Sequence, residues 1–206
     1  MDSHRWTVVQ REAETCTRCE LHTARSRVVF GDGDPGAELV FVGDSPRHSE
    51  ELSGRALAGA AGNLLDNVLL ENGLRREDVY VCNLVKCRPP GNRPPQADEI
   101  GACRRHLHDQ LGLVAARVIV ALGPAAAQLL LGRRAPLEKV AGYRFEAPGA
   151  TLIATYHPIA ALRGNATAMA ALRRDVRTAA GILTGRIASA RDAVGELREG
   201  QGSAAS

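Results

Sequence analysis

Four of the five cysteines are spaced like the ligands of a metal centre. Cys16 and Cys19 form a C-x2-C pair, Cys87 follows after 67 residues, and Cys103 after 15 more. Four thiols from three separate stretches suit a cubane iron–sulfur cluster or a structural zinc. The alternative is four unrelated buried or free thiols, but two of them lie in polar, arginine-rich surroundings, which favours a metal centre. Cys82 lies in the apolar run V-Y-V-C-N-L-V and is predicted to be an ordinary core thiol.

Three other polar residues follow or end apolar runs. Asn83 lies within one such run, where an amide is costly unless it is hydrogen-bonded, and it can read the edge of a planar heterocycle or bridge core backbone groups. His157 precedes Pro158, which holds its backbone extended; it is either a reactive group or a satisfied structural histidine. Asp44 can hold a water or stabilise positive charge, and the alternative is a turn or helix cap.

Cationic side chains accompany these residues in the same loops. They suit phosphate groups, with solvated surface charge as the alternative for each one. They are Lys86, Arg88, Arg93 and Arg163.

Alternating strand and helix patterns predict the elements that position these residues. Strands are expected over 38–43, 79–85, 117–122 and 151–156, and helices over 5–15, 59–72, 96–111, 124–132 and 166–183. This order predicts an α/β fold, a three-layer α/β/α sandwich around a four-stranded parallel sheet. Ligands of such sheets bind at the carboxyl ends of the strands, so the polar loops are expected to meet at one edge.

Composition limits the classes of protein that need consideration. The 206 residues are 45% hydrophobic and 24% charged, which is typical of one globular domain. No apolar stretch reaches the roughly 20 residues of a membrane span, and no secretory signal is evident, so we expect a cytoplasmic protein. A net charge of +3 permits nucleic-acid binding, whereas 3% aromatic residues argue against stacking many bases. We expect one domain over 1–184, including the N-terminal arm, and a polar, partly disordered extension over 185–206.

The chain resembles the iron–sulfur (family 4) uracil-DNA glycosylases over roughly residues 14–183. The resemblance rests on C-T-R-C-E-L, V-V-F-G-D-G-D-P, V-G-D-S-P, E-D-V-Y-V-C-N-L-V-K-C-R-P-P-G-N-R, A-L-G and H-P-I-A-A-L-R, in matching order and spacing. It implies a monomeric enzyme with a structural [4Fe-4S] cluster on Cys16, Cys19, Cys87 and Cys103. It also implies that Asn83 reads a uracil flipped out of DNA and that His157 supports the departing base.

The resemblance assigns further residues to substrate and DNA. Gly43, Ser45, Arg47 and Leu57 would line the base pocket. The loop from Pro158 to Arg163 would enter the minor groove, with Leu162 and Arg163 holding the gap open. The remaining DNA contacts would come from Arg88, Asn92 and Arg93.

Two motifs depart from the family pattern. Typical members read G-E-(A/G)-P-G where this chain has Gly43-Asp44-Ser45-Pro46-Arg47, so Arg47 replaces a glycine and Asp44 shortens the acid by one methylene. They read G-(K/R)-P-F-V-G where Leu57 replaces a phenylalanine that stacks on uracil, an interaction of roughly 1–3 kcal/mol. No inserted basic loop follows Cys87, so no covalent DNA adduct is expected, although His48 is a spare nucleophile.

These residues predict a monofunctional DNA glycosylase of base excision repair, acting on uracil or a related deaminated base. Asn83 would be the reader, His157 the electrophilic helper, and Asp44 the group that positions water. Arg47 and Leu57 leave open a DNA-damage-binding module with little turnover, or a glycosylase of changed base specificity. A zinc-stabilised nucleotide-binding protein is a third alternative. The sequence leaves single- or double-strand preference open.

Overall fold

The computed structural model describes residues 2–187 and has one six-stranded sheet in the order β1-β3-β2-β4-β6-β5. The strands are β1 (Asp32–Gly33), β2 (Leu39–Gly43), β3 (Tyr80–Asn83), β4 (Val118–Leu122), β5 (Arg144–Ala147) and β6 (Ala150–Thr155). The four central strands are parallel, which confirms the predicted sheet, and β1 and β5 add short antiparallel edges.

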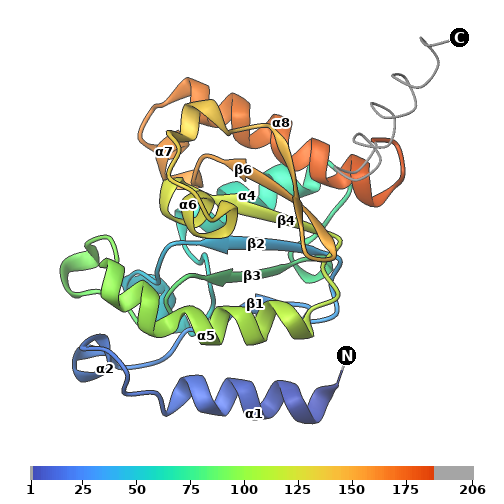
Figure 1. The fold of residues 1–206 in the computed structure, drawn as a ribbon. Helices are drawn as coiled ribbons and strands as arrows, with labels where there is room; N and C mark the ends of the chain where they lie inside the picture. Colours follow the sequence, from blue (N-terminus) through green and yellow to red (C-terminus); the bar gives the residue numbers. More distant parts are fainter. Residues whose placement is uncertain (1, 188–206) are drawn as a thin grey trace, which may run out of the picture.

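Helices cover both faces of this sheet (Figure 1). The longer ones are α1 (Ser3–Glu14), α4 (Ala60–Leu70), α5 (Ala97–Leu113), α6 (Pro124–Leu131) and α8 (Ala166–Leu183). The shorter ones are α2 (Leu21–Ala24), α3 (His48–Ser53), α7 (Pro158–Leu162) and the 3-10 turns η1 (Arg76–Asp78), η2 (Pro90–Asn92) and η3 (Leu137–Lys139).

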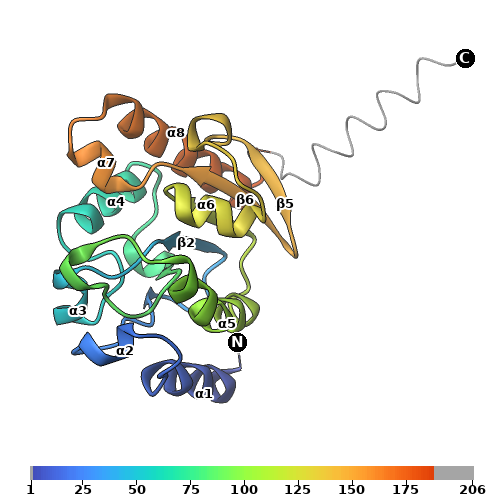
Figure 2. The ribbon, with the colours of Figure 1, turned by 60° about the vertical axis from the view of Figure 1, so that its left-hand side comes forward.

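Alternating residues of the strands build two cores. Leu39 and Phe41 of β2 face one hydrophobic cluster with α4 and α8, whereas Val40 and Val42 face a second cluster with α5 and α6. Side chains alternate between the faces of a strand, and both faces here are covered, so the central strands are apolar throughout. The predicted three-layer α/β/α sandwich is therefore confirmed, and the views in Figures 1 and 2 agree on it.

An N-terminal arm of α1 and α2 packs outside these three layers, along α5 (Figures 1 and 2). Trp6 of α1 anchors it, with its ring edge-on to Phe30 at 5.3 Å and to Tyr80 at 5.4 Å between centroids. Such edge-to-face pairs add to the free energy of burying the rings. The arm thereby carries Cys16 and Cys19 to one end of α5.

Two short helices form where the sequence predicts none. One is α3, where the Glu50 side chain accepts the Arg47 N–H at the start of the helix. The predicted loop after His157 is α7, which begins with Pro158 at its first position. Patterns in five or six residues are too short to reveal helices of one turn.

The chain remains packed beyond α8, since Ile187 contacts the cluster under α4 and α8. The rest of the predicted C-terminal extension, residues 188–206, lies outside the described residues. Among the helices of residues 2–187, none combines the length and the apolar character that spanning a membrane requires.

Candidate active site and cysteine cavity

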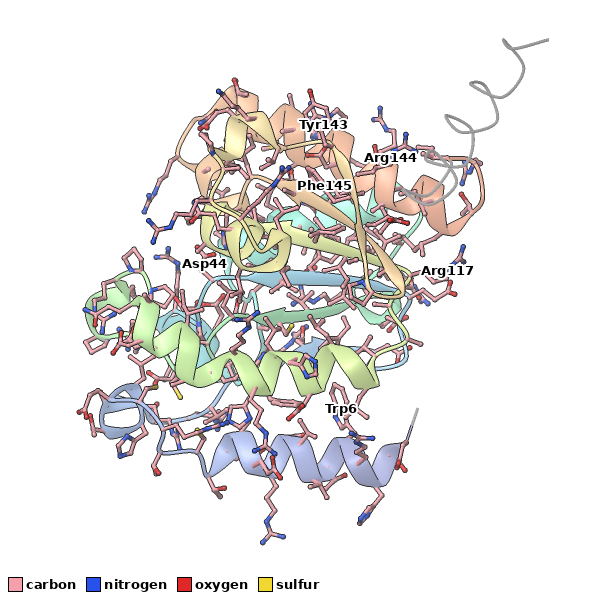
Figure 3. All side chains as sticks on the ribbon, viewed as in Figure 1. Trp6, Asp44, Arg117, Tyr143, Arg144 and Phe145 are labelled. Carbon is pink, nitrogen blue, oxygen red and sulfur yellow. The ribbon has the colours of Figure 1, made fainter. Side chains whose placement is uncertain are left out.

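The carboxyl ends of β2, β3 and β6 bring three predicted site residues together. Gly43 and Asn83 end neighbouring parallel strands and are register partners. A Cβ at Gly43 would lie 2.5 Å from Asn83 Oδ1 and 3.7 Å from His157 Nε2, so only glycine leaves room at this point. Asp44 follows Gly43, and Figure 3 places it at the sheet edge where the strands end. The four residues therefore surround one small region, as the topology predicts.

Asn83 presents an unused donor to this region. Its side chain is 2% exposed, and Nδ2 has no hydrogen-bond partner within the described part of the chain. A buried amide nitrogen without a partner is unusual in folded proteins because desolvating it is costly. Asn83 therefore lacks the full set of bonds expected of a core amide, and Nδ2 is available to a ligand.

His157 presents a second donor, and its neighbours fix the tautomer. The Ile159 N–H donates to His157 Nδ1 over 3.2 Å, so the proton of the neutral ring is assigned to Nε2. Burial, followed by the positive charge of Arg47, lowers the pKa of His157 to about 4. The ring is thus neutral at physiological pH. Its backbone is extended, as predicted before a proline, with φ −67° and ψ 138°.

Asp44 adds a carboxylate that is only partly satisfied. The Ala126 N–H at the start of α6 donates to it, but Oδ1 has no partner in residues 2–187. Burial raises the pKa of Asp44 to about 6, against the opposing effects of the Ala126 N–H and Arg47. The Val85 N–H, which donates to the Asp44 carbonyl over 3.2 Å, fixes the backbone. An anionic oxygen is therefore present above pH 6, open to a water or a cationic group.

The Asp44 pKa sets an expected pH profile. If the ionised carboxylate acts in catalysis, the single-turnover rate falls about tenfold per unit as pH drops below about 6 and is level above it. His157, with a pKa of about 4, stays neutral over the same range. Rates of base release between about pH 5 and pH 8 check this. The Asp44→Asn variant should be slow and independent of pH, and a flat wild-type profile would contradict the assignment.

Asp44 should also affect the stability of the fold, which is expected to fall with rising pH, whereas the rate rises. Because its pKa is raised on folding, the folded state holds the proton more tightly, and stability falls as pH rises through the interval from 3.8 to about 6. Asp44→Asn is accordingly expected to raise Tm at neutral pH, which thermal unfolding measures.

Two of the positions that depart from the family pattern, Arg47 and Leu57, are linked by one buried carboxylate, which the sequence did not reveal. Glu50 accepts the N–H of Arg47 and also the N–H groups of Leu57 and Ala58. Leu57 is 3% exposed in the hydrophobic cluster under α4 and has φ +52°, which is strained for a branched side chain. Glu50 thereby holds both segments together. Ser45, half-buried, lies between Asp44 and Arg47 on the same loop.

Two arginines that the sequence predicts as DNA contacts are paired with carboxylates. Arg88 donates to Asn92 Oδ1 over 2.8 Å and to Glu51 over 3.2 Å. Arg93 forms a bidentate pair with Glu99, at 2.6 and 2.9 Å. The positive charge of each arginine is therefore offset by a carboxylate, which makes both side chains less available to bind phosphate groups.

Two residues at the end of α7 are exposed and so accessible to DNA, and their role in the minor groove stays a prediction. Leu162 and Arg163 are exposed at the end of α7, beyond His157. Lys86, predicted to face phosphates, is fully buried, so that expectation is wrong.

The four predicted metal ligands line one cavity. Cys16 and Cys19 come from the arm, Cys87 from the loop after β3 and Cys103 from α5. The Arg25 guanidinium donates to the Cys87 sulfur over 3.2 Å and also holds the Cys16 carbonyl at 2.8 Å. Cys82 is buried elsewhere, in the second core cluster, as predicted.

The geometry of this cavity bears on which metal centre it suits. A single tetrahedral zinc, with Zn–S bonds of about 2.3 Å, needs four sulfurs within about 4 Å of one another. Within residues 2–187 no three Cys, His, Asp or Glu side chains converge tightly enough for a metal ion. The four thiols line one cavity, with arginine donors at two of them, and four thiolates are the donor set that iron–sulfur clusters use.

Comparison with known proteins agrees with this geometry. Residues 30–179 match the model of the uracil DNA glycosylase superfamily. The chain is 42% identical over 158 residues to a type-4 uracil-DNA glycosylase of Thermotoga maritima, covering 76% of this chain and 82% of that protein. A type-4 uracil-DNA glycosylase of Archaeoglobus fulgidus is 42% identical over 162 residues, covering 75% and 81%. A type-5 uracil-DNA glycosylase of Thermus thermophilus is 36% identical over 153 residues, covering 64% and 69%. The chain therefore belongs to the uracil-DNA glycosylase superfamily and, within it, to the type-4 enzymes.

Proposed function

We propose that this protein is a monofunctional DNA glycosylase that hydrolyses the N-glycosidic bond of uracil in DNA, as the first step of base excision repair. The observation that carries the proposal is the set of unsatisfied polar atoms around Gly43. Asn83 Nδ2 and Asp44 Oδ1 are buried without partners, and His157 Nε2 carries a proton beside them. Two donors and one acceptor gathered at the carboxyl ends of the strands match a planar base with carbonyl oxygens and a ring N–H.

The chemistry follows from where charge develops. As the bond from the sugar C1′ to the base N1 breaks, its electron pair leaves with the base, which becomes anionic while the sugar becomes cationic. His157 Nε2–H donates to a carbonyl oxygen of the base and stabilises that anion. A neutral imidazole does this without giving up its proton, consistent with a pKa of about 4. Asn83 recognises the opposite edge of the base and fixes its orientation.

Asp44 acts on the sugar side of the reaction. Its carboxylate stabilises the positive charge and orients a water whose oxygen bonds to C1′, while the water proton neutralises the departing base. Lysine occurs only at positions 86 and 139, and Lys86 is buried in hydrogen bonds to Asn83 and Gln110. Lys86 is thus not free to form a Schiff base with the sugar, and the expected product is an abasic site in an intact strand.

Cys16, Cys19, Cys87 and Cys103 would hold a [4Fe-4S] cluster, which supplies structural cross-linking rather than redox chemistry to the reaction. The residues around them fit this role, since Arg18 and Arg25 donate to the Cys16 and Cys87 sulfurs. Charge-assisted donors of this kind favour thiolates over thiols.

The α7 segment would support the flipped base from the DNA side. Leu162 is 45% exposed and lies five residues after His157 in sequence. An apolar side chain there can occupy the gap left in the duplex, whereas a single strand leaves no such gap. Leu162→Ala should lower the rate on U:A duplexes roughly tenfold and on single strands less than about twofold. Leu70→Ala, at a 59% exposed leucine of α4, is the matched control. Equal losses on both substrates would contradict the role.

The proposed activity is tested by single-turnover incubation with end-labelled oligonucleotides that contain uracil, followed by alkali and a denaturing gel. Single-stranded, U:G and U:A substrates are compared, with hypoxanthine and xanthine alongside. A cleaved band after alkali, absent before it, supports a monofunctional glycosylase. Intact DNA throughout, from folded and iron-loaded protein, would support a damage-binding module. In that case, the double variant Arg47→Gly and Leu57→Phe is expected to recover base release.

A further inference from the structure

Lys86 is a fully buried cation between the base pocket and the cysteine cavity. Its side chain is 0% exposed, and it lies three residues after Asn83. The ammonium donates to the Asn83 carbonyl over 2.8 Å and to Gln110 Oε1 over 2.5 Å. Both bonds are buried, so they are strong in this environment and costly to lose.

The position of Gln110 is itself fixed. Its Nε2 donates to the Phe30 carbonyl over 2.8 Å and to the Tyr80 hydroxyl over 2.6 Å. A carbonyl oxygen can only accept, so the amide nitrogen must face Phe30, and the amide oxygen must face Lys86. Lys86 is therefore held at one end by a rigid acceptor and holds the Asn83 peptide at the other.

No carboxylate neutralises Lys86, because the ion pairs found in residues 2–187 do not include it. Burying an unpaired ammonium is costly, and proteins compensate with an opposite charge. Lys86 also lines the cavity formed by the four cysteines, where its backbone N–H donates to the Cys103 sulfur and its positive charge favours the Cys103 thiolate. A metal centre bound by four thiolates carries negative charge at this place.

We propose that Lys86 is a positioning residue, which aligns the base-reading amide of Asn83 and takes its counter-charge from the anionic centre held by the four cysteines. The inference rests on the proposed function, since it assigns Lys86 to the same pocket. It gives the cysteine cavity a direct connection to base recognition. The Lys86 ammonium holds the Asn83 peptide, and Lys86 also lines the cavity of the four cysteines.

The identity of the side chain supports this role. The chain uses arginine almost throughout and has lysine only at 86 and 139. An ammonium directs three donors from one atom, whereas a planar guanidinium is larger and directs its donors in a fork. Lys86→Arg should therefore not substitute for lysine, although it preserves the charge.

The experiment compares Lys86→Met and Lys86→Arg with Lys139→Met, at the only other lysine, in iron-loaded protein. Binding of free uracil is measured by calorimetry without DNA, together with kcat and KM, iron content and the decay of the visible absorbance under a chelator. We expect the Lys86 variants to bind uracil ten- to about a hundredfold more weakly, with a lower kcat and KM for DNA unchanged within about twofold. We also expect faster loss of absorbance from Lys86→Met, while Lys139→Met behaves as wild type.

Several outcomes would overturn the inference. Normal uracil binding by folded, iron-loaded Lys86→Met would show that Lys86 does not position Asn83. Should Lys86→Met not fold, Gln110→Leu removes one support of the ammonium and leaves the lysine in place. It must then weaken uracil binding at wild-type iron content, and normal binding would refute the proposal. If wild-type protein neither binds nor releases uracil, the proposed function itself fails, which is a distinguishable result.

Discussion

Replacing His157 by alanine is expected to slow uracil release about 10²- to 10³-fold, as found when one donor to a developing anion is removed. The loss should appear in kcat, because the Nε2–H bond strengthens only as the base gains charge. Single-turnover rates under saturating enzyme measure it directly. The affinity for uracil-containing DNA should change little.

A histidine outside the pocket provides the control for this prediction. The His108 side chain is 85% exposed on α5, so His108→Ala should leave the rate unchanged. The pH dependence offers a further check, because neutral His157 needs no protonation above its pKa of about 4. A rate that rises as pH falls from about 8 to 6 would indicate an imidazolium and would contradict the donor role.

Replacing Asn83 by leucine should separate activity from stability. The side chains are similar in size, but leucine cannot recognise a base edge, and pairing polar groups of uracil with an apolar surface should lower kcat/KM by at least about 100-fold. The same change removes the unpaired Nδ2, whose burial costs about 1–3 kcal/mol. We therefore expect Tm to stay level or rise while base release falls.

Thermal unfolding and single-turnover rates on the same preparation check the Asn83 prediction. Asn67→Leu, at an exposed position of α4, is the matched control and should affect neither quantity. A clear fall in Tm for Asn83→Leu would mean that the amide supports the core, and the alternative interpretation of a structural asparagine would then hold.

The sheet and the meeting of Asn83, Gly43 and His157 could be predicted because both follow from local patterns and one topological rule. Apolar runs of five or six residues, separated by helical patterns, indicate parallel strands. Parallel strands place their carboxyl ends at one edge. The register of β2 with β3, which pairs Gly43 with Asn83, is known only from the structure.

The roles of Glu50 and Lys86 could not be predicted, because both depend on partners distant in sequence or on burial that no local pattern reveals. Lys86 follows a strand end in an arginine-rich loop, which predicts a phosphate ligand. Its burial depends on Gln110, 24 residues further on, and on the arm that covers the cavity. The helix α7 was missed because it has five residues, too few to show a periodic pattern.

The N-terminal arm has a consequence for the order of folding. The ribosome makes α1 first, but the helix against which it packs, α5, ends only at Leu113. Cys103, the last of the four thiols, is on that same helix, so the arm and the cluster site can close only after α5 has been made. Closing so long a loop is entropically unfavourable and slow. Iron is thus expected to be inserted late in the biogenesis of the protein. Until then, Cys16 and Cys19 are expected to stay exposed to solvent.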